Sequence, residues 1–299
     1  MYESFYGLSG PPFSLLPDAG FLFMSRRHRR AVNLLDYGIA AQAGFIVMTG
    51  EVGAGKTTLI RRYLKNAGAD VAVGVITNAS PASGCLLDWV AMAYGFENEG
   101  LEGIRLHARF VDFLVKQYGS GKRAVLIVDE AQNLTPAMLE DLRMLSNVNN
   151  EKDQMLQIIL VGQPELLETL KRPDLRQFVQ RISAHCHIDP MTAAETAAYI
   201  RHRLGVVGGA ADLFDDDACA AVHYFTGGVP RLINLLCDQA MLYAFSDDRP
   251  RIGSDLVVEV AADHGRAGLS AFRAPPALSR AGIKGELRPI LDAMREEAA

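Results

Sequence analysis

Residues 50–57 place glycines, a lysine and a threonine at a spacing suited to binding phosphate. The pattern G-x-x-x-x-G-K-T is matched by Gly50, Glu51, Val52, Gly53, Ala54, Gly55, Lys56 and Thr57, with Thr58 next in the chain. Glycines let a loop turn its backbone N–H groups toward phosphate oxygens, and the helix that follows adds partial positive charge. In this pattern the lysine reaches the β- and γ-phosphates and the threonine hydroxyl binds Mg²⁺. The sequence therefore predicts a nucleoside triphosphate site with a Mg²⁺ ion.

Two carboxylates, Asp129 and Glu130, come directly after the apolar run 124–128. A nucleoside triphosphatase needs a carboxylate at a strand end to hold the metal, which is the role predicted for Asp129. Glu130 projects beyond the strand, where a carboxylate can take a proton from an attacking water. Together with the loop at 50–57, this pair favours hydrolysis over a solvated acidic turn.

Two amide side chains follow other apolar runs. Gln163 comes shortly after the run 156–161, separated from it by Gly162. We expect its amide to lie beside the acidic strand, near the γ-phosphate. The alternative is a turn that caps the helix starting near Glu165. Asn78 ends the run 71–77. It could bond Glu130 and hold it away from the water until a partner binds, or be an ordinary turn asparagine.

Three arginines are candidates for contacting nucleotide. Arg176 and Arg181 precede the last apolar run, where one of them, with Arg181 favoured, would reach a neighbouring chain's nucleotide as an arginine finger; the alternative is a surface salt bridge. Arg231 follows Gly227-Gly228-Val229-Pro230, which predicts that it lies in the first turn of a helix. An arginine is unfavourable at a helix N-terminus, so an anionic partner such as the γ-phosphate is expected there.

These residues must be positioned by an α/β fold. Short apolar runs alternate with helical patterns up to residue 189, which predicts a five-stranded parallel sheet with helices on both faces. After residue 190 only helical patterns remain, so a small all-helical domain follows. We expect the boundaries 1–44 for an N-terminal loop and helix packing on the core, 45–189 for the α/β domain, 190–265 for the helical domain, and 266–299 for a linker and a short amphipathic helix.

The chain ends carry their own patterns. Residues 1–24 are rich in aromatic side chains and prolines, which favours a segment lying across a larger surface, and Ser25 can cap the helix after it. The terminal helix has one apolar face, formed by Ile283, Leu287, Ile290, Leu291 and Met294. This face would dock a partner or fold back on the chain's own core; the spacing alone favours neither.

The composition is that of a folded protein in a reducing compartment. The 299 residues are 49% hydrophobic and 22% charged, with a net charge of −5, so no overall positive field attracts nucleic acid or anionic lipid. The cysteines show no C-x-x-C pairing, which argues against zinc and disulfides, and we interpret His185 and His187 as packing residues. No signal or membrane-spanning segment is recognisable, so a cytoplasmic protein, with peripheral contact at the inner membrane, is expected.

One local basic segment departs from this balance. Four arginines lie within residues 26–30. We interpret them as a solvated helix face, with contact to DNA or another anionic polymer and contact to a membrane surface as alternatives.

Taken together, the 50–57 loop, Asp129, Glu130, Gln163, Arg181 and the turn 227–231 resemble the P-loop NTPases of the AAA+ type, with the helical domain as their lid. The N-terminal part of the chain resembles the ExeA family, also called general secretion pathway protein A, which includes members encoded with exopolysaccharide systems. The segments that carry this resemblance are Tyr6-Gly7-Leu8, Pro12-Phe13-Ser14-Leu15, Pro17-Asp18, Phe21-Leu22-Phe23, Ser25-Arg26-Arg27-His28 and Tyr37-Gly38-Ile39. The resemblance implies that Gln163 is sensor 1 and Arg231 is sensor 2.

The resemblance also implies an activity and partners. It implies a homo-oligomer, as a ring or filament, that hydrolyses Mg·ATP between its two domains for a secretion or polysaccharide-export complex. Longer ExeA proteins continue into a membrane span and a peptidoglycan-binding domain, whereas residues 266–299 provide a linker and one helix. The same core resembles the transposition ATPases of the TniB and MuB type, so a DNA-associated regulator remains an alternative, as does a slow ATP-dependent switch.

Overall fold

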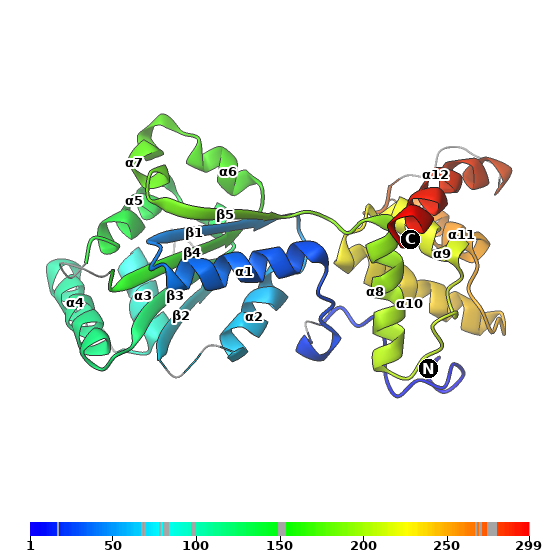
Figure 1. The fold of residues 1–299 in the computed structure, drawn as a ribbon, viewed down its shortest axis with the longest axis horizontal. Helices are drawn as coiled ribbons and strands as arrows, with labels where there is room; N and C mark the ends of the chain where they lie inside the picture. The colour runs from blue at the N-terminus through cyan, green and yellow to red at the C-terminus, as the bar shows by residue number, and fades with distance from the viewer. Residues whose placement is uncertain are drawn as a thin grey trace. The chain divides into compact units, whose positions relative to one another are not determined.

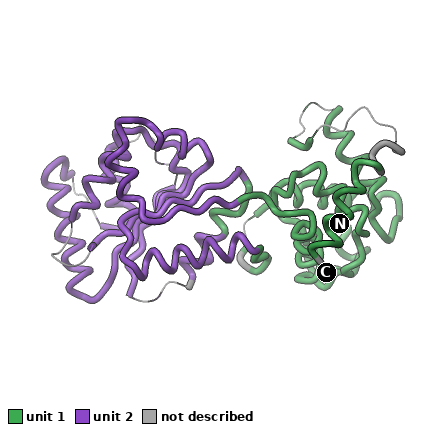
Figure 2. The backbone as a smooth tube through the Cα atoms, turned by 45° about the horizontal axis from the view of Figure 1, so that its top comes forward, with its two compact units in different colours: residues 1–25, 53–58, 189–299 green, residues 26–52, 59–188 purple. Residues whose placement is uncertain are grey.

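The fold is described by a computed structural model. It describes the chain except residues 17, 67, 69, 78, 80–83, 97–99, 149–153, 267, 269–270, 274–279 and 299. Two compact units are present: a helical unit (residues 1–25, 53–58 and 189–299) and a sheet unit (residues 26–52 and 59–188) (Figure 2). Of the sequence predictions, Asn78, the side chain of Ile283 and most of the linker lie outside the described residues.

The sheet unit is built on a five-stranded parallel sheet, as the sequence predicted. Its strands are β1 (Phe45–Gly50), β2 (Val71–Thr77), β3 (Arg123–Asp129), β4 (Leu156–Gly162) and β5 (Ile182–Ile188). Their order is β2-β3-β4-β1-β5, so the three nearly continuous apolar runs occupy the centre. Because all strands run in parallel, their carboxyl ends meet at one edge of the sheet, the edge at which polar residues follow β1, β3 and β4.

Helices cover both faces of this sheet. They are α1 (Arg26–Ala40), α2 (Lys56–Asn66), α3 (Leu86–Tyr94), α4 (Gly103–Gly119), α5 (Pro136–Leu145), α6 (Glu165–Leu170) and α7 (Arg176–Val179), with 3₁₀ turns η3 (Ala131–Asn133) and η4 (Pro173–Leu175). Figure 1 shows α1 on one side of the sheet and α5, α6 and α7 on the other. In α1, Arg26, Arg29 and Arg30 are exposed and His28 is buried, so the basic segment is spread around the helix.

The fifth strand departs from the expectation that every strand is buried on both faces. Strand β5 is an edge strand, and Ser183, His185 and His187 alternate as exposed residues along it. We interpreted His185 and His187 as packing residues, but the structure leaves both exposed on this strand. An edge strand needs apolar side chains on one face only, which is why its sequence alternates while β4 is apolar almost throughout.

The helical unit contains the second hydrophobic core. Its helices are α8 (Ala193–Val206), α9 (Asp216–Thr226), α10 (Pro230–Ser246), α11 (Ser254–Arg266) and α12 (Arg280–Ala298), with the 3₁₀ turn η1 (Ala19–Phe21). Thr192 and Glu195 form a capping box at the start of α8. Asp215 caps α9 by accepting a bond from the backbone N–H of Ala218 at 2.6 Å.

The N-terminal segment lies in the helical unit, rather than on the α/β core as we expected for residues 1–44. Phe13 is 1% exposed and packs edge-on against Phe214, with ring centroids 5.8 Å apart. Arg203 of α8 donates to the carbonyl oxygen of Pro12 at 2.6 Å and lies over the ring of Phe21. The aromatic residues that suggested a surface-covering segment therefore complete this unit's core.

Truncating Phe13 tests how far the helical unit depends on this segment. We expect Phe13→Ala to lower the free energy of unfolding by about 3 kcal/mol, because it removes a fully buried ring and leaves a cavity. The urea midpoint, followed by far-ultraviolet circular dichroism, measures the change. Leu16→Ala is the matched control, since Leu16 is 79% exposed in the same segment. Equal midpoints for both variants would show that the segment adds nothing to the core.

The terminal helix α12 folds back on its own chain, which was one of the two alternatives left open by its apolar face. It packs on α8 and α9, and Leu287 and Met294 are buried in the core of the helical unit. The hydroxyl of Thr192 also donates to Glu297 at 2.8 Å. At Leu287, Ile290, Leu291 and Met294 the apolar face is thus packed against the chain's own core.

Candidate functional site

The phosphate-type loop has the setting that its sequence predicted. Strand β1 ends at Gly50 and helix α2 begins at Lys56, so residues 51–55 form the turn between them. Gly53 and Gly55 adopt φ values of 79° and 91°, which other residues rarely reach. A Cβ at Gly50 would lie 2.7 Å from the carbonyl oxygen of Ile188. Three glycines are therefore required by this loop, and its backbone conformation fits the binding of a phosphate chain.

In the helical unit, Arg231 lies against this loop. Pro230 opens α10 as its first residue, which places Arg231 in the first turn as predicted. The Arg231 backbone N–H donates to the carbonyl oxygen of Gly53 at 3.4 Å, and a Cβ at Gly53 would lie 2.5 Å from the Arg231 Cβ. The Arg231 side chain is exposed. Its guanidinium therefore extends from a backbone position that touches the loop.

The acidic pair lies at the carboxyl end of β3. Asp129 is the last residue of the strand and is buried, and its carboxylate accepts a bond from the Glu130 N–H at 3.0 Å. Glu130 has φ 55° and ψ 38°, in the left-handed region that a non-glycine residue rarely occupies. This conformation turns the chain sharply off the strand into η3. Strained backbone of this kind concentrates at functional sites, where neighbouring contacts hold it.

Two glutamine amides hold the Glu130 carboxylate. Gln132 Nε2 donates to Glu130 Oε2 at 2.5 Å, and Gln163 Nε2 donates to the same oxygen at 3.2 Å. The Gln163 backbone N–H donates in turn to Gln132 Oε1 at 3.0 Å. The structure thus brings Gln163 to the acidic strand, as its place at the end of β4 predicted. Gln132 was not among the predicted site residues, because it belongs to a single 3₁₀ turn without a periodic pattern.

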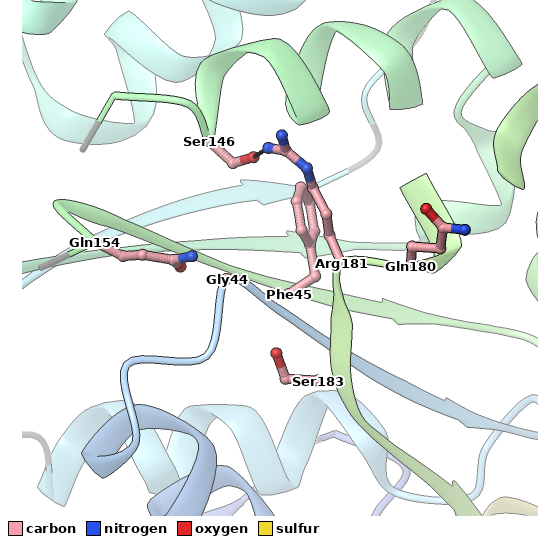
Figure 3. A pocket seen from close by; sticks show the side chains of 7 residues that line it. All are labelled: Gly44, Phe45, Ser146, Gln154, Gln180, Arg181 and Ser183. Carbon is pink, nitrogen blue, oxygen red and sulfur yellow. Dashed lines mark hydrogen bonds between the residues drawn. The ribbon is translucent and has the colours of Figure 1, made fainter. Parts of the chain in front are cut away.

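Arg181 lies at the opposite edge of the sheet from Glu130. It immediately precedes β5, whose seven residues span about 20 Å. Its Nη1 donates to the Ser146 hydroxyl at 3.0 Å (Figure 3). It also donates to the Arg143 carbonyl oxygen at 3.4 Å. It lines a cavity of about 330 Å³ at the amino ends of β1 and β5. Within one sheet unit Arg181 is therefore remote from the acidic pair.

Arg176 is the second finger candidate. It is the first residue of α7 and is exposed, and no bond from its side chain to another described residue is present. The two arginines thus differ: Arg181 is tied to the end of α5, whereas Arg176 extends into solvent.

The buried residue Thr49, next to the loop, contacts both exposed histidines of β5. Its hydroxyl lies 3.1 Å from His185 Nε2 and 2.9 Å from His187 Nδ1. Removal from water, together with the nearby His187, lowers the pKa of His185. The histidines therefore have a polar contact at the end of β1 in addition to their place on the edge strand.

The cysteines form no disulfide among the described residues. Burial raises the pKa of Cys186 to about 11 and that of Cys219 to about 12, so both remain thiols near neutral pH. Within the described part of the chain, no group of three or more His, Cys, Asp or Glu side chains is arranged to hold a metal by itself. Nor does any described helix have the length and apolar character to cross a bilayer.

Comparison with known proteins agrees with this geometry. Residues 39–170 match the AAA domain family, a stretch that includes the loop, the acidic pair and Gln163. The chain is also 40% identical over 273 residues to general secretion pathway protein A of Aeromonas hydrophila, covering 91% of this chain and 48% of that protein. Its sequence is ExeA-like, and its fold is of the AAA+ type. The chain spans about half the length of that relative.

Solved structures of AAA+ proteins share the fold. The Aeropyrum pernix ORC2 protein superposes with a TM-score of 0.60 at 17% identity, over 85% of this chain and 71% of that one. Cdc6p of Pyrobaculum aerophilum gives a TM-score of 0.60 at 17% identity, over 84% and 71%. RuvB of Thermotoga maritima gives 0.51 at 18% identity, over 83% and 72%. At such identities the likeness shows the fold alone. The predicted ExeA resemblance and the predicted P-loop NTPase fold with a helical C-terminal region are confirmed.

Proposed function

We propose that this AAA+ protein binds Mg·ATP at the loop 50–57 and hydrolyses it. The observation that carries the proposal is the loop conformation, which requires glycine at positions 50, 53 and 55 and ends at Lys56 on the first turn of α2. A loop of this shape directs backbone N–H groups toward an anion at the start of a helix. Lys56 would contact the β- and γ-phosphates, and Thr57 and Asp129 would hold the metal.

The reaction in this proposal is an in-line attack of water on the γ-phosphorus. The water oxygen forms a bond to phosphorus while the bond to the β,γ-bridging oxygen breaks, releasing ADP and phosphate. Glu130 takes the proton from the water. When bound, Mg²⁺ would neutralise charge on the β- and γ-phosphate oxygens. Lys56 and the Arg231 side chain would offset the charge that develops on the transferred group.

We further propose that the active form is a homo-oligomer, in a ring or filament. The position of Arg181 supports this, since an arginine at the opposite edge of the sheet from Glu130 is remote from its own chain's acidic pair. Arg181 would instead reach the nucleotide of a neighbouring chain, as an arginine finger does. Arg176 is the alternative finger.

The work driven by ATP is proposed to be assembly or regulation of a secretion or exopolysaccharide-export complex. The support is the 40% identity to general secretion pathway protein A of Aeromonas hydrophila. Protein partners at such a complex are therefore expected, with peripheral contact at the membrane surface.

Phosphate release tests this function directly. Purified full chain is incubated with ATP and Mg²⁺, with ATP and EDTA, and with duplex DNA at two salt concentrations. We expect Mg²⁺-dependent turnover that DNA changes less than twofold. Strong stimulation that salt abolishes would instead identify a DNA-associated regulator, because phosphate contacts are salt-sensitive. Calorimetry that detects no ATP binding at all would exclude the proposed site.

A further inference from the structure

Gln132 uses both ends of its side-chain amide. Its Oε1 faces the Gln163 backbone N–H at 3.0 Å, and its Nε2 faces Glu130 Oε2 at 2.5 Å. A backbone N–H can only donate, so the oxygen of the Gln132 amide must lie on that side and its NH₂ group on the carboxylate side. The orientation of this side chain is therefore fixed by the network rather than chosen between two equivalent flips.

The end of β4 leaves room for this amide. A Cβ at Gly162 would lie 3.1 Å from Gln132 Oε1, 3.3 Å from the Gln132 backbone nitrogen and 3.0 Å from a Leu166 methyl group. These distances are tighter than ordinary contacts with a Cβ atom. Glycine at position 162 thus lets Gln132 approach β4 and join the ends of β3 and β4 through one side chain.

The network distinguishes the two oxygens of Glu130. The two glutamine amides donate to Oε2, and no bond from another described residue to Oε1 is present. A carboxylate oxygen that already accepts two hydrogen bonds has little capacity left for a proton from water. Oε1 is therefore the oxygen available to a water molecule, and the amides fix the direction in which it points.

We propose that Gln132 is a positioning residue for the base Glu130. It holds Oε2, holds Gln163 beside it through the Gln163 N–H, and so presents Oε1 to the attacking water. This inference rests on the proposed ATP hydrolysis and adds to it a residue outside the loop and the acidic pair. Gln132 itself contacts neither water nor nucleotide in this role.

Two substitutions at position 132 separate bonding from space filling. Gln132→Met keeps the length of the side chain without polar atoms, and Gln132→Glu keeps its shape without an N–H donor. We expect each to lower kcat for ATP by about 10- to 100-fold, with KM and the ATP dissociation constant within threefold of the unsubstituted chain. If Gln132 only fills space, the uncharged variant Gln132→Met would retain full turnover. Gln117→Met, in the last turn of α4, is the matched control and should be unchanged.

Gly162→Ala provides an independent variant that leaves every polar side chain of the network in the chain. The added methyl group would displace Gln132, so a similar loss of kcat is expected. In the double variant Gly162→Ala with Gln132→Met, the fold reduction in kcat should be smaller than the product of the two single-variant reductions, because both substitutions act through one contact.

Hydrogen exchange of the Gln163 backbone N–H tests the contact without turnover. In the nucleotide-free full chain labelled with ¹⁵N, its exchange should accelerate at least tenfold in Gln132→Met and stay unchanged in Gln117→Met. Unchanged exchange, or normal kcat in both Gln132 variants, would overturn the positioning role. An unsubstituted chain that binds ATP without hydrolysing it would instead refute the proposed function.

Discussion

Replacing Lys56 with alanine is expected to remove ATP binding and, with it, hydrolysis. Lys56 is the first residue of α2, directly after the loop, and is 6% exposed, so it is largely shielded from solvent. A hydrogen bond to a charged group contributes up to about 3 kcal/mol, which corresponds to about 100-fold in the dissociation constant. Calorimetric titration with Mg·ATP measures the change.

The control for this experiment is a lysine on the same helix. Lys65 lies in the last turn of α2 and is exposed, so Lys65→Ala removes the same charge away from the loop. Its ATP affinity should equal that of the unsubstituted chain. Tight ATP binding by Lys56→Ala would show that the 50–57 loop does not bind the phosphate chain, and the proposed site would have to be abandoned.

The second large effect is expected for Glu130→Gln. An amide has nearly the shape of the carboxylate but cannot take a proton from water, so ATP should still bind while turnover falls by about 100- to 1,000-fold. Single-turnover measurements with bound ATP separate the chemical step from product release. The expected result is a chain that retains ATP long enough to be isolated with it.

Glu168→Gln is the matched control for Glu130→Gln. Glu168 lies on α6 with a side chain 72% exposed, in a surface ion pair with Lys171. Such pairs contribute little, so turnover and stability should be unchanged. Should Glu130→Gln hydrolyse ATP at the normal rate, another group must activate the water, and the role of Gln132 would end with that of Glu130.

The strands and the two main site segments were predictable because one physical signal specifies them. A strand buried on both faces must be apolar almost throughout, so the runs ending at Gly50, Asp129 and Gly162 marked both the sheet and its functional edge. In a parallel sheet these ends meet, so the acidic pair and Gln163 were expected together. The burial of strand β5 was less predictable, because an edge strand is covered on one face only and needs apolar side chains on that face alone.

Other features depend on contacts that no local pattern encodes. Gln132 meets a backbone N–H 31 positions further along the chain, and only the fold brings the two together. Nothing in the single turn after Glu130 distinguishes Gln132 from a solvated loop residue. The location of the N-terminal segment in the helical unit was not predicted, for a similar reason. Its aromatic residues indicated that it covers a surface, but the partner surface is made by residues near Arg203 and Phe214, almost two hundred positions later.

The division of the chain has a consequence for its synthesis. Both ends of the chain belong to the helical unit, while residues 59–188 of the sheet unit come between them. During translation the sheet unit can therefore complete its core before the ribosome has made α8. Phe13, synthesised before the sheet unit, must wait for the later helices before it is shielded from water. A chaperone that binds exposed aromatic segments would have its longest opportunity at the segment around Phe13.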